Sequence, residues 1–158
     1  MTIRKARPED GRRLLELIEA LADFEKLPKP DESAKERLLK DLFAETPRVE
    51  VLLAELDGHA VGYAFFFETY STFLALPTLY LEDLFVLPEY RGRKLGYGLF
   101  LGCVAEAHRR GCGRMEWEVL NWNIHAIEFY ERLGAKRLGE WCGYRLPRAD
   151  MAAILKSG

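Results

Sequence analysis

Apolar and polar positions follow two periods along the chain, and their order predicts helices alternating with strands. The alternating segment Thr2–Arg7 is typical of a first strand. Apolar residues at helical spacing over Leu14–Ala22 then give one face of a helix, which should end before Pro28. A similar apolar face over Leu38–Phe43 indicates a second helix that closes before Pro47.

The middle of the chain is rich in strand signals. Val49–Leu56 and His59–Tyr70 flank Asp57-Gly58, a dipeptide that favours a two-residue hairpin turn. A loop over Ser71–Pro77 separates this hairpin from a further apolar strand, Thr78–Leu87. Three successive strands therefore follow the two helices.

The last part of the chain returns to mixed elements. Leu99, Cys103 and Ala107 form the core face of a helix that glycines 111 and 113 end. Beyond it we expect a strand over Arg114–Leu120, a helix from Asn123 to Leu133, short strands over Lys136–Leu138 and Trp141–Leu146, and a short helix after Pro147. This order predicts an α/β (α+β) fold with a mixed sheet, in a single domain over residues 1–158.

Composition restricts the function. A net charge of −2 argues against a general nucleic-acid binder, which usually has a strongly basic face. The N-terminus lacks the apolar segment of a signal peptide, and no apolar run is long enough to span a bilayer. Three cysteines without framework spacing favour a reducing, cytoplasmic setting. The expected partners therefore include neither nucleic acid nor membrane.

The stretch Tyr80–Gly98 carries the strongest chemical signal. An apolar strand containing Glu82 and Asp83 breaks at Pro88, passes through a basic, glycine-containing turn and enters a helix near Leu95. A loop of this kind at a helix N-terminus holds phosphates, because free backbone N–H groups and the helix dipole both favour an anion. The stretch lacks the third glycine of a dinucleotide fingerprint, and the chain has no GxxxxGK[ST]. An ordinary solvated turn remains the alternative.

Two segments resemble a known family. Val86-Leu-Pro-Glu-Tyr-Arg-Gly-Arg-Lys-Leu-Gly96 is similar to the acetyl-CoA signature of the GCN5-related N-acetyltransferase (GNAT) superfamily, and Asn123-Ile-His-Ala-Ile-Glu-Phe-Tyr-Glu-Arg-Leu-Gly-Ala135 to its second diagnostic helix. Leu21-Ala-Asp-Phe-Glu25, Leu79-Tyr-Leu-Glu-Asp-Leu-Phe-Val86 and Trp122-Asn123 resemble the spermidine/spermine (diamine) acetyltransferase branch. The resemblance extends along nearly the whole chain.

This resemblance implies a fold and a co-substrate. The GNAT fold has a mixed, mostly antiparallel twisted sheet of about six to seven strands with about four helices, and the sheet splays open at the cofactor site. Acetyl-CoA would lie there, its pyrophosphate on the loop and its pantetheine paired with the strand. A backbone N–H of the strand would polarise the thioester carbonyl. The implied cofactor-binding residues are Phe85, Val86, Arg91, Gly92, Arg93, Lys94, Leu95, Gly96, Tyr97, Gly98, Asn123, Ala126, Phe129 and Tyr130.

Lys94 departs from the family motif, which usually has glycine at this position. Glycine lets the backbone approach the phosphates or adopt a positive φ, which lysine does less easily. We expect Lys94 to be tolerated and to add a charge contact to the phosphates.

The resemblance also assigns catalytic roles. Tyr130 would be the general acid, because a phenol with a pKa of about 10 stays protonated at neutral pH and can protonate the departing thiolate. Glu82 would be the base, through water, and Asp83 would anchor the amine. Adjacent strand residues point to opposite faces, so both acids can line one cleft only if a bulge re-aims one of them. The alternatives are a core aromatic for Tyr130 and an ion pair for the acids.

Further positions concern the acceptor, a small cationic amine. Glu25 matches a family position near the polyamine channel, and Trp122 and Tyr144 offer aromatic walls for an alkyl-ammonium group. A polyamine or diamine is the preferred acceptor by resemblance, and a lysine-like amino acid such as thialysine is the alternative. A non-catalytic acyl-CoA-binding module is a third reading. No metal is expected, and the family implies a homodimer, in which Trp141 and Tyr144 would be buried.

Overall fold

A five-stranded sheet organises the part of the chain from Met1 to Glu118. In the computed structural model, which describes residues 1–158, the strands are β1 (Thr2–Lys5), β2 (Glu50–Leu56), β3 (His59–Ser71), β4 (Leu76–Val86) and β5 (Arg114–Glu116), in that spatial order. Neighbouring strands are antiparallel, except β4 and β5, which are parallel. The sheet is therefore mixed and mostly antiparallel, as the sequence predicted.

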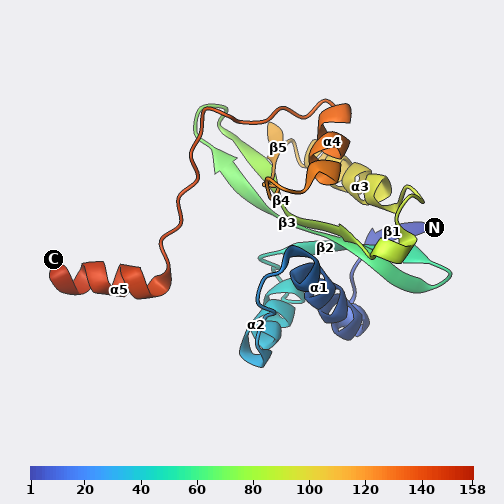
Figure 1. The fold of residues 1–158 in the computed structure, drawn as a ribbon, viewed down its shortest axis with the longest axis horizontal. Helices are drawn as coiled ribbons and strands as arrows, with labels where there is room; N and C mark the ends of the chain where they lie inside the picture. The colour runs from blue at the N-terminus through green and yellow to red at the C-terminus, as the bar shows by residue number, and fades with distance from the viewer. The chain divides into compact units, whose positions relative to one another are not determined.

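Helices cover both faces of this sheet. Helices α1 (Gly11–Glu25) and α2 (Glu32–Leu42) lie on one face, and α3 (Leu95–Arg109) lies on the other (Figure 1). Two short 3-10 turns, η1 (Pro8–Asp10) and η2 (Pro88–Tyr90), lead into α1 and into the loop before α3. The helices begin and end within a few residues of the predicted positions.

Alternation along the strands builds the core between the sheet and α1. Leu14 and Leu17 of α1 are fully buried, and they pack against inward-facing residues from every second position of the central strands. The members from those strands are Val51, Leu53, Tyr63, Phe65 and Phe85. Because Phe85 belongs to this cluster, the packing determines which face of β4 is turned toward α1.

The tight turn between β2 and β3 has the geometry that its sequence demands. Asp57 and Gly58 have φ values of 51° and 79°, as a two-residue type I′ hairpin turn requires. The turn sets the register between β2 and β3.

Residues Val119–Gly158 form a second unit, which is described by itself. It contains α4 (Ile124–Arg132) and α5 (Arg148–Ser157). Asn123 caps α4 as predicted, because its side-chain oxygen accepts a hydrogen bond from the N–H of Ala126 at 3.3 Å.

The strand count was predicted incorrectly. The segments 136–138 and 141–146 form no strands, and β5 has three residues instead of the seven expected over Arg114–Leu120. A strand needs a partner strand to which its backbone is hydrogen-bonded as well as an alternating sequence, and the length of this pairing decides how far the strand extends. The structure thus has five strands and five α-helices, and no helix with the length and apolar character that a membrane crossing requires.

Candidate active site

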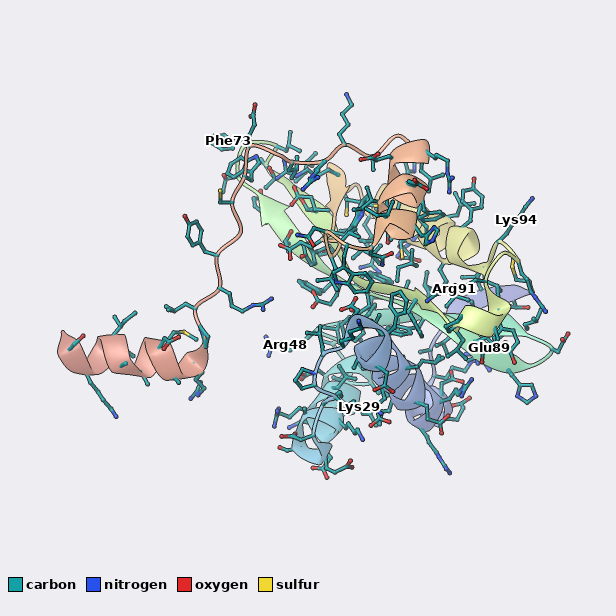
Figure 2. All side chains as sticks on the ribbon, viewed as in Figure 1. Lys29, Arg48, Phe73, Glu89, Arg91 and Lys94 are labelled. Atoms are coloured by element: carbon teal, nitrogen blue, oxygen red, sulfur yellow. The ribbon has the colours of Figure 1, made fainter.

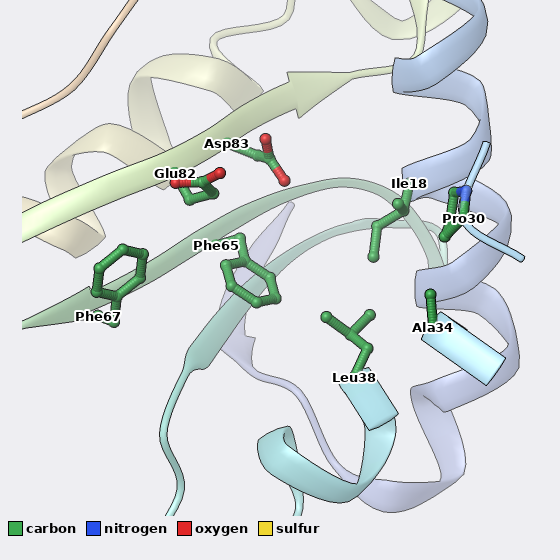
Figure 3. A pocket seen from close by; sticks show the side chains of 8 residues that line it. All are labelled: Ile18, Pro30, Ala34, Leu38, Phe65, Phe67, Glu82 and Asp83. Carbon is green, nitrogen blue, oxygen red and sulfur yellow. The ribbon is translucent and has the colours of Figure 1, made fainter. Parts of the chain in front are cut away.

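A β-bulge in β4 lies at Glu82. Phe65 is paired with Asp83 and the next residue of β3, Phe66, is paired with Leu81, so Glu82 has no partner opposite it. A bulge changes the direction of the side chains around it, which in a regular strand would alternate between the faces. Both Glu82 and Asp83 accordingly line the same pocket (Figure 3).

This pocket lies between the sheet and the first two helices. It has a volume of about 440 Å³, and all its lining residues other than the two acids are apolar. They are Ile18 of α1, Pro30 of the connector, Ala34 and Leu38 of α2, and Phe65 and Phe67 of β3 (Figure 3). In such a pocket the carboxylates attract a cationic group, and the apolar walls accommodate an alkyl chain.

Asp83 has the most perturbed carboxyl group of the pocket. Burial, together with the negative charges of Glu82 and Glu25, raises the pKa of Asp83 from 3.8 to about 6, although a hydrogen bond from Tyr63 acts in the opposite direction. Asp83 therefore changes its charge close to neutral pH, a property that is frequent at functional sites.

Tyr63 is a site residue that the sequence reasoning missed. Its hydroxyl donates to Oδ2 of Asp83 at 3.2 Å, and its fully buried ring lies 6.4 Å from that of Phe85. Burial raises the pKa of Tyr63 well above its usual value, so the hydroxyl remains a donor. A signal was present, because a buried tyrosine among phenylalanines usually has a hydrogen-bond partner for its hydroxyl.

Glu25 is close to this site without lining the pocket. It is the last residue of α1, and burial raises its pKa. Its charge contributes to the raised pKa values of Asp83 and Tyr63. The structure thus brings three acidic groups near one another, two of which line the pocket.

The loop before α3 presents backbone donors. Gly92 and Lys94 have positive φ values, 79° and 61°, and Lys94 is the N-cap of the helix. Leu95, Gly96 and Tyr97 occupy the first turn, where N–H groups have no acceptor within the helix. The N–H of Arg91 already donates to the carbonyl of Pro88 at 3.2 Å, so it is not among the free donors. The remaining donors at the helix N-terminus suit an anion.

Arg91 connects this loop to β4 and α1. Its Nε donates to the carbonyl oxygen of Val86 at 3.0 Å, and its guanidinium lies 4.7 Å from the centre of the Phe24 ring. Arg91 is labelled in Figure 2. Burial lowers the pKa of Arg91. The Arg91 side chain is therefore engaged in contacts although the residue, like Arg93 and Lys94, is exposed.

The edge of β4 that faces β5 is open next to this loop. β5 pairs only with the segment Thr78–Tyr80, so the rest of β4, including Phe85 and Val86, has no strand partner on that edge. The side chain of Phe85 is buried in the core, which leaves only its backbone for a contact at the edge. The sheet is open at the place where the resemblance implied a splayed sheet.

Several expected site residues belong to the C-terminal unit. Asn123 caps α4, and Ala126 donates to that cap. The rings of Phe129 and Tyr130 meet edge to face, with centres 5.1 Å apart. Trp122 and Tyr144 are exposed. Their roles stay predictions, including that of Tyr130 as the acid.

An open strand edge leading into a helix N-terminus, together with a pocket that has two carboxylates, is the arrangement that the resemblance to the GNAT superfamily implied. Residues 14–135 match the model of the Acetyltransferase (GNAT) family. Thialysine N-epsilon-acetyltransferase of Bos taurus is 36% identical, over 96% of this chain and 94% of that protein. The chain belongs to the GNAT family and is an N-acetyltransferase.

Two other proteins extend the comparison. Spermidine/spermine N(1)-acetyltransferase-like protein 1 of Homo sapiens is 30% identical, over 97% of this chain and 23% of that longer protein. The solved structure of an integron cassette protein from the mobile metagenome of V. cholerae has a TM-score of 0.82 at 23% identity, covering 98% of this chain and 97% of its own. The second likeness concerns the fold alone.

Proposed function

We propose that this chain transfers the acetyl group of acetyl-CoA to the side-chain amine of a lysine-like amino acid, such as thialysine. The observation that carries the proposal is the pocket with one acidic end, at Glu82 and Asp83, and otherwise apolar walls. Such a pocket accommodates one ammonium group followed by an alkyl chain. The similarity to a thialysine N-epsilon-acetyltransferase over nearly the whole chain supports the same acceptor.

A polyamine is the second candidate. It carries several cationic groups along its length, and each would need its own carboxylate, because an unpaired charge is costly next to apolar walls. The acids at this site, Glu25, Glu82 and Asp83, lie close to one another, and all other residues that line the pocket are apolar. The relative named after spermidine and spermine keeps the polyamine in consideration.

Acetyl-CoA is the donor used by this family, and the residues of the loop suit it. The backbone N–H groups from Gly92 to Tyr97 would hold the pyrophosphate, and the open edge of β4 near Val86 would pair with the pantetheine. The thioester supplies an activated acetyl group. Lys94 adds a positive charge at the same helix N-terminus.

The proposed reaction is a direct transfer. The amine nitrogen forms a bond to the acetyl carbon, and the bond between that carbon and sulfur breaks. At pH 7 an alkyl amine with a pKa of about 10.4 is almost fully protonated, so a proton must leave before attack. Asp83 would hold the ammonium, Glu82 would accept its proton through water, and the Tyr130 hydroxyl would protonate the thiolate. The nitrogen would lose its second proton as the amide forms, which restores the Tyr130 hydroxyl, so that one proton is released in each transfer.

The experiment is an acceptor panel. Release of the CoA thiol is measured with thialysine, lysine, ornithine, putrescine, spermidine and spermine, and kcat/KM is compared. We expect the highest value for thialysine or lysine, and a clear preference for spermidine or spermine would contradict the proposal.

A Tyr130→Phe variant should lose about 10²-fold in kcat while keeping its KM for acetyl-CoA. Unchanged turnover would remove Tyr130 from the mechanism.

We also propose that the chain acts as a homodimer, as the family resemblance implies. The exposed side chains of Trp141 and Tyr144 support this, because large exposed aromatic residues are typical of surfaces that meet a partner.

A further inference from the structure

The side chain of Tyr63 has two parts with different surroundings, an aromatic ring in the core and a hydroxyl group at the pocket. The ring is fully buried in the core cluster between β3 and α1, and it contacts the ring of Phe85. The hydroxyl extends from this core to Oδ2 of Asp83 at 3.2 Å. One carboxylate oxygen is thus held from inside the sheet, and Oδ1 remains for a ligand of the pocket.

The surroundings of Asp83 explain why such a contact matters. Asp83 faces Glu82 on its own strand, Glu25 at the end of α1, and Tyr63 on β3. The other residues that line the pocket are all apolar. Burial and the two glutamates disfavour a charged Asp83, whereas a hydrogen bond from a neutral phenol favours it. Tyr63 is the one group of this set that stabilises the carboxylate before an amine arrives.

We propose that Tyr63 is a positioning residue for the acceptor, whose hydroxyl holds the Asp83 carboxylate in the orientation that receives the ammonium group. Tyr63 does not contact the reacting atoms in this role. It acts through Asp83, and its effect concerns binding of the amine far more than the chemical step. The inference rests on the proposed function only in that a cationic amine enters this pocket, and it holds for whichever amine proves the best acceptor.

The test is the substitution Tyr63→Phe, which keeps the ring and removes the hydroxyl. Tyr70→Phe is the matched control, because Tyr70 lies on the same strand and is 64% exposed. With the best acceptor of the panel at pH 7, Tyr63→Phe should raise the KM for the amine roughly tenfold, the loss expected for a hydrogen bond to a charged group. The KM for acetyl-CoA and kcat should stay near those of the parent, and Tyr70→Phe should match the parent in all three.

Two further readouts separate positioning from a structural defect. The acidic limb of kcat/KM should move to higher pH in Tyr63→Phe, because the hydrogen bond no longer favours the charged carboxylate, and the difference in KM should narrow at alkaline pH. In an Asp83→Ala background, Tyr63→Phe should have almost no additional effect on the KM for the amine, since the hydroxyl then has no carboxylate to hold. Calorimetric titration of the amine into the CoA-bound protein checks the affinity without turnover.

The proposal fails if Tyr63→Phe binds the amine as the parent does, with the same pH profile. It also fails if the KM for acetyl-CoA rises as much as that for the amine, because the hydroxyl would then support the fold in general. Turnover of spermidine in place of thialysine would overturn the acceptor class proposed above and leave the role of Tyr63 standing. The two ideas can thus fail separately.

Discussion

At the scale of single residues, the backbone at Lys94 explains why glycine is usual at this position of the motif. The sequence indicated that a glycine was usual here because of a positive φ or a close approach, and the backbone does have φ = 61°. Lysine adopts this left-handed conformation at an energetic cost.

The contact between Tyr63 and Asp83, by contrast, joins residues 20 positions apart, and it depends on the register of two strands that a sequence does not specify.

The cost at Lys94 gives a stability prediction. Lys94→Gly should raise the free energy of unfolding by about 0.5–1 kcal/mol, because glycine adopts this φ without steric strain. Lys40→Gly in α2 is the control, and should lower it by about 1 kcal/mol, since glycine weakens a helix. Urea denaturation of both variants measures the difference. A loss of stability in Lys94→Gly would mean that the lysine side chain contributes more than its backbone costs.

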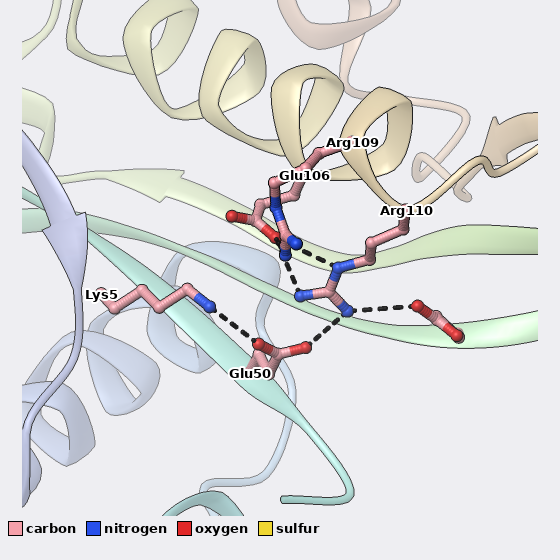
Figure 4. Close-up of polar contacts among 6 residues, drawn as sticks. Lys5, Glu50, Glu106, Arg109 and Arg110 are labelled. Atoms are coloured by element: carbon pink, nitrogen blue, oxygen red, sulfur yellow. Dashed lines mark hydrogen bonds and ion pairs between the residues drawn. The ribbon is translucent and has the colours of Figure 1, made fainter.

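At the scale of elements, Arg110 joins the end of α3 to two strands on the sheet face below it (Figure 4). Its guanidinium contacts Glu50 of β2 at 2.7 Å, Glu68 of β3 at 3.3 Å and Glu106 of α3 at 3.0 Å. Lys5 of β1 also reaches Glu50, at 3.3 Å. The sequence predicted each of these elements from its own periodicity, but this cluster depends on how they pack, which periodicity does not describe.

Removing the centre of this cluster should destabilise the protein. Arg110→Ala should lower the free energy of unfolding by about 2 kcal/mol, because it leaves two partly buried carboxylates, Glu50 and Glu106, and the exposed Glu68 without their shared partner. Arg109→Ala, whose side chain is 64% exposed, is the control and should change it by less than about 0.5 kcal/mol. Thermal and urea unfolding test both variants. Equal stability of Arg110→Ala and the parent would show that the cluster adds nothing.

The same cluster predicts a dependence on pH. Burial alone would raise the pKa of Glu50, but the hydrogen bond and the charge of Arg110 leave it lowered, and hydrogen bonds from Arg109 and Arg110 lower the pKa of Glu106. Carboxylates with lowered pKa values stabilise the fold above their unfolded value of 4.5, and this contribution is lost as the pH falls through the folded value. The difference between Arg110→Ala and the parent should therefore shrink below about pH 4.5 in unfolding experiments.

At the scale of the whole molecule, the sequence predicted the order of elements well up to α4. Hydrophobic periodicity, the Asp57-Gly58 turn and the loop before α3 are local signals, and local signals were sufficient there. The failure lies at 136–146, where alternating residues form no strand. The alternation of a strand is visible in a sequence, but the edge that it pairs with is not.

The homodimer proposal is tested at this scale. Sedimentation of the 18.2 kDa chain should give about twice this mass, and the double variant Trp141→Ser, Tyr144→Ser should shift the equilibrium to the monomer, because it removes large apolar contacts. Lys29→Ser, which changes an exposed charged residue in the connector between α1 and α2 (labelled in Figure 2), is the control and should leave the mass unchanged. A monomer at all concentrations would contradict the proposal.

The bulge in β4 also has a consequence for chain length. Because Glu82 has no residue opposite it, a chain shorter by this one residue would place Leu81 and Asp83 in succession opposite Phe66 and Phe65, in an uninterrupted ladder. A sheet redesigned only for regularity would lose this residue, and with it one of the two acids of the pocket. A one-residue gap at this point would therefore distinguish chains that share the sheet from chains that share the pocket.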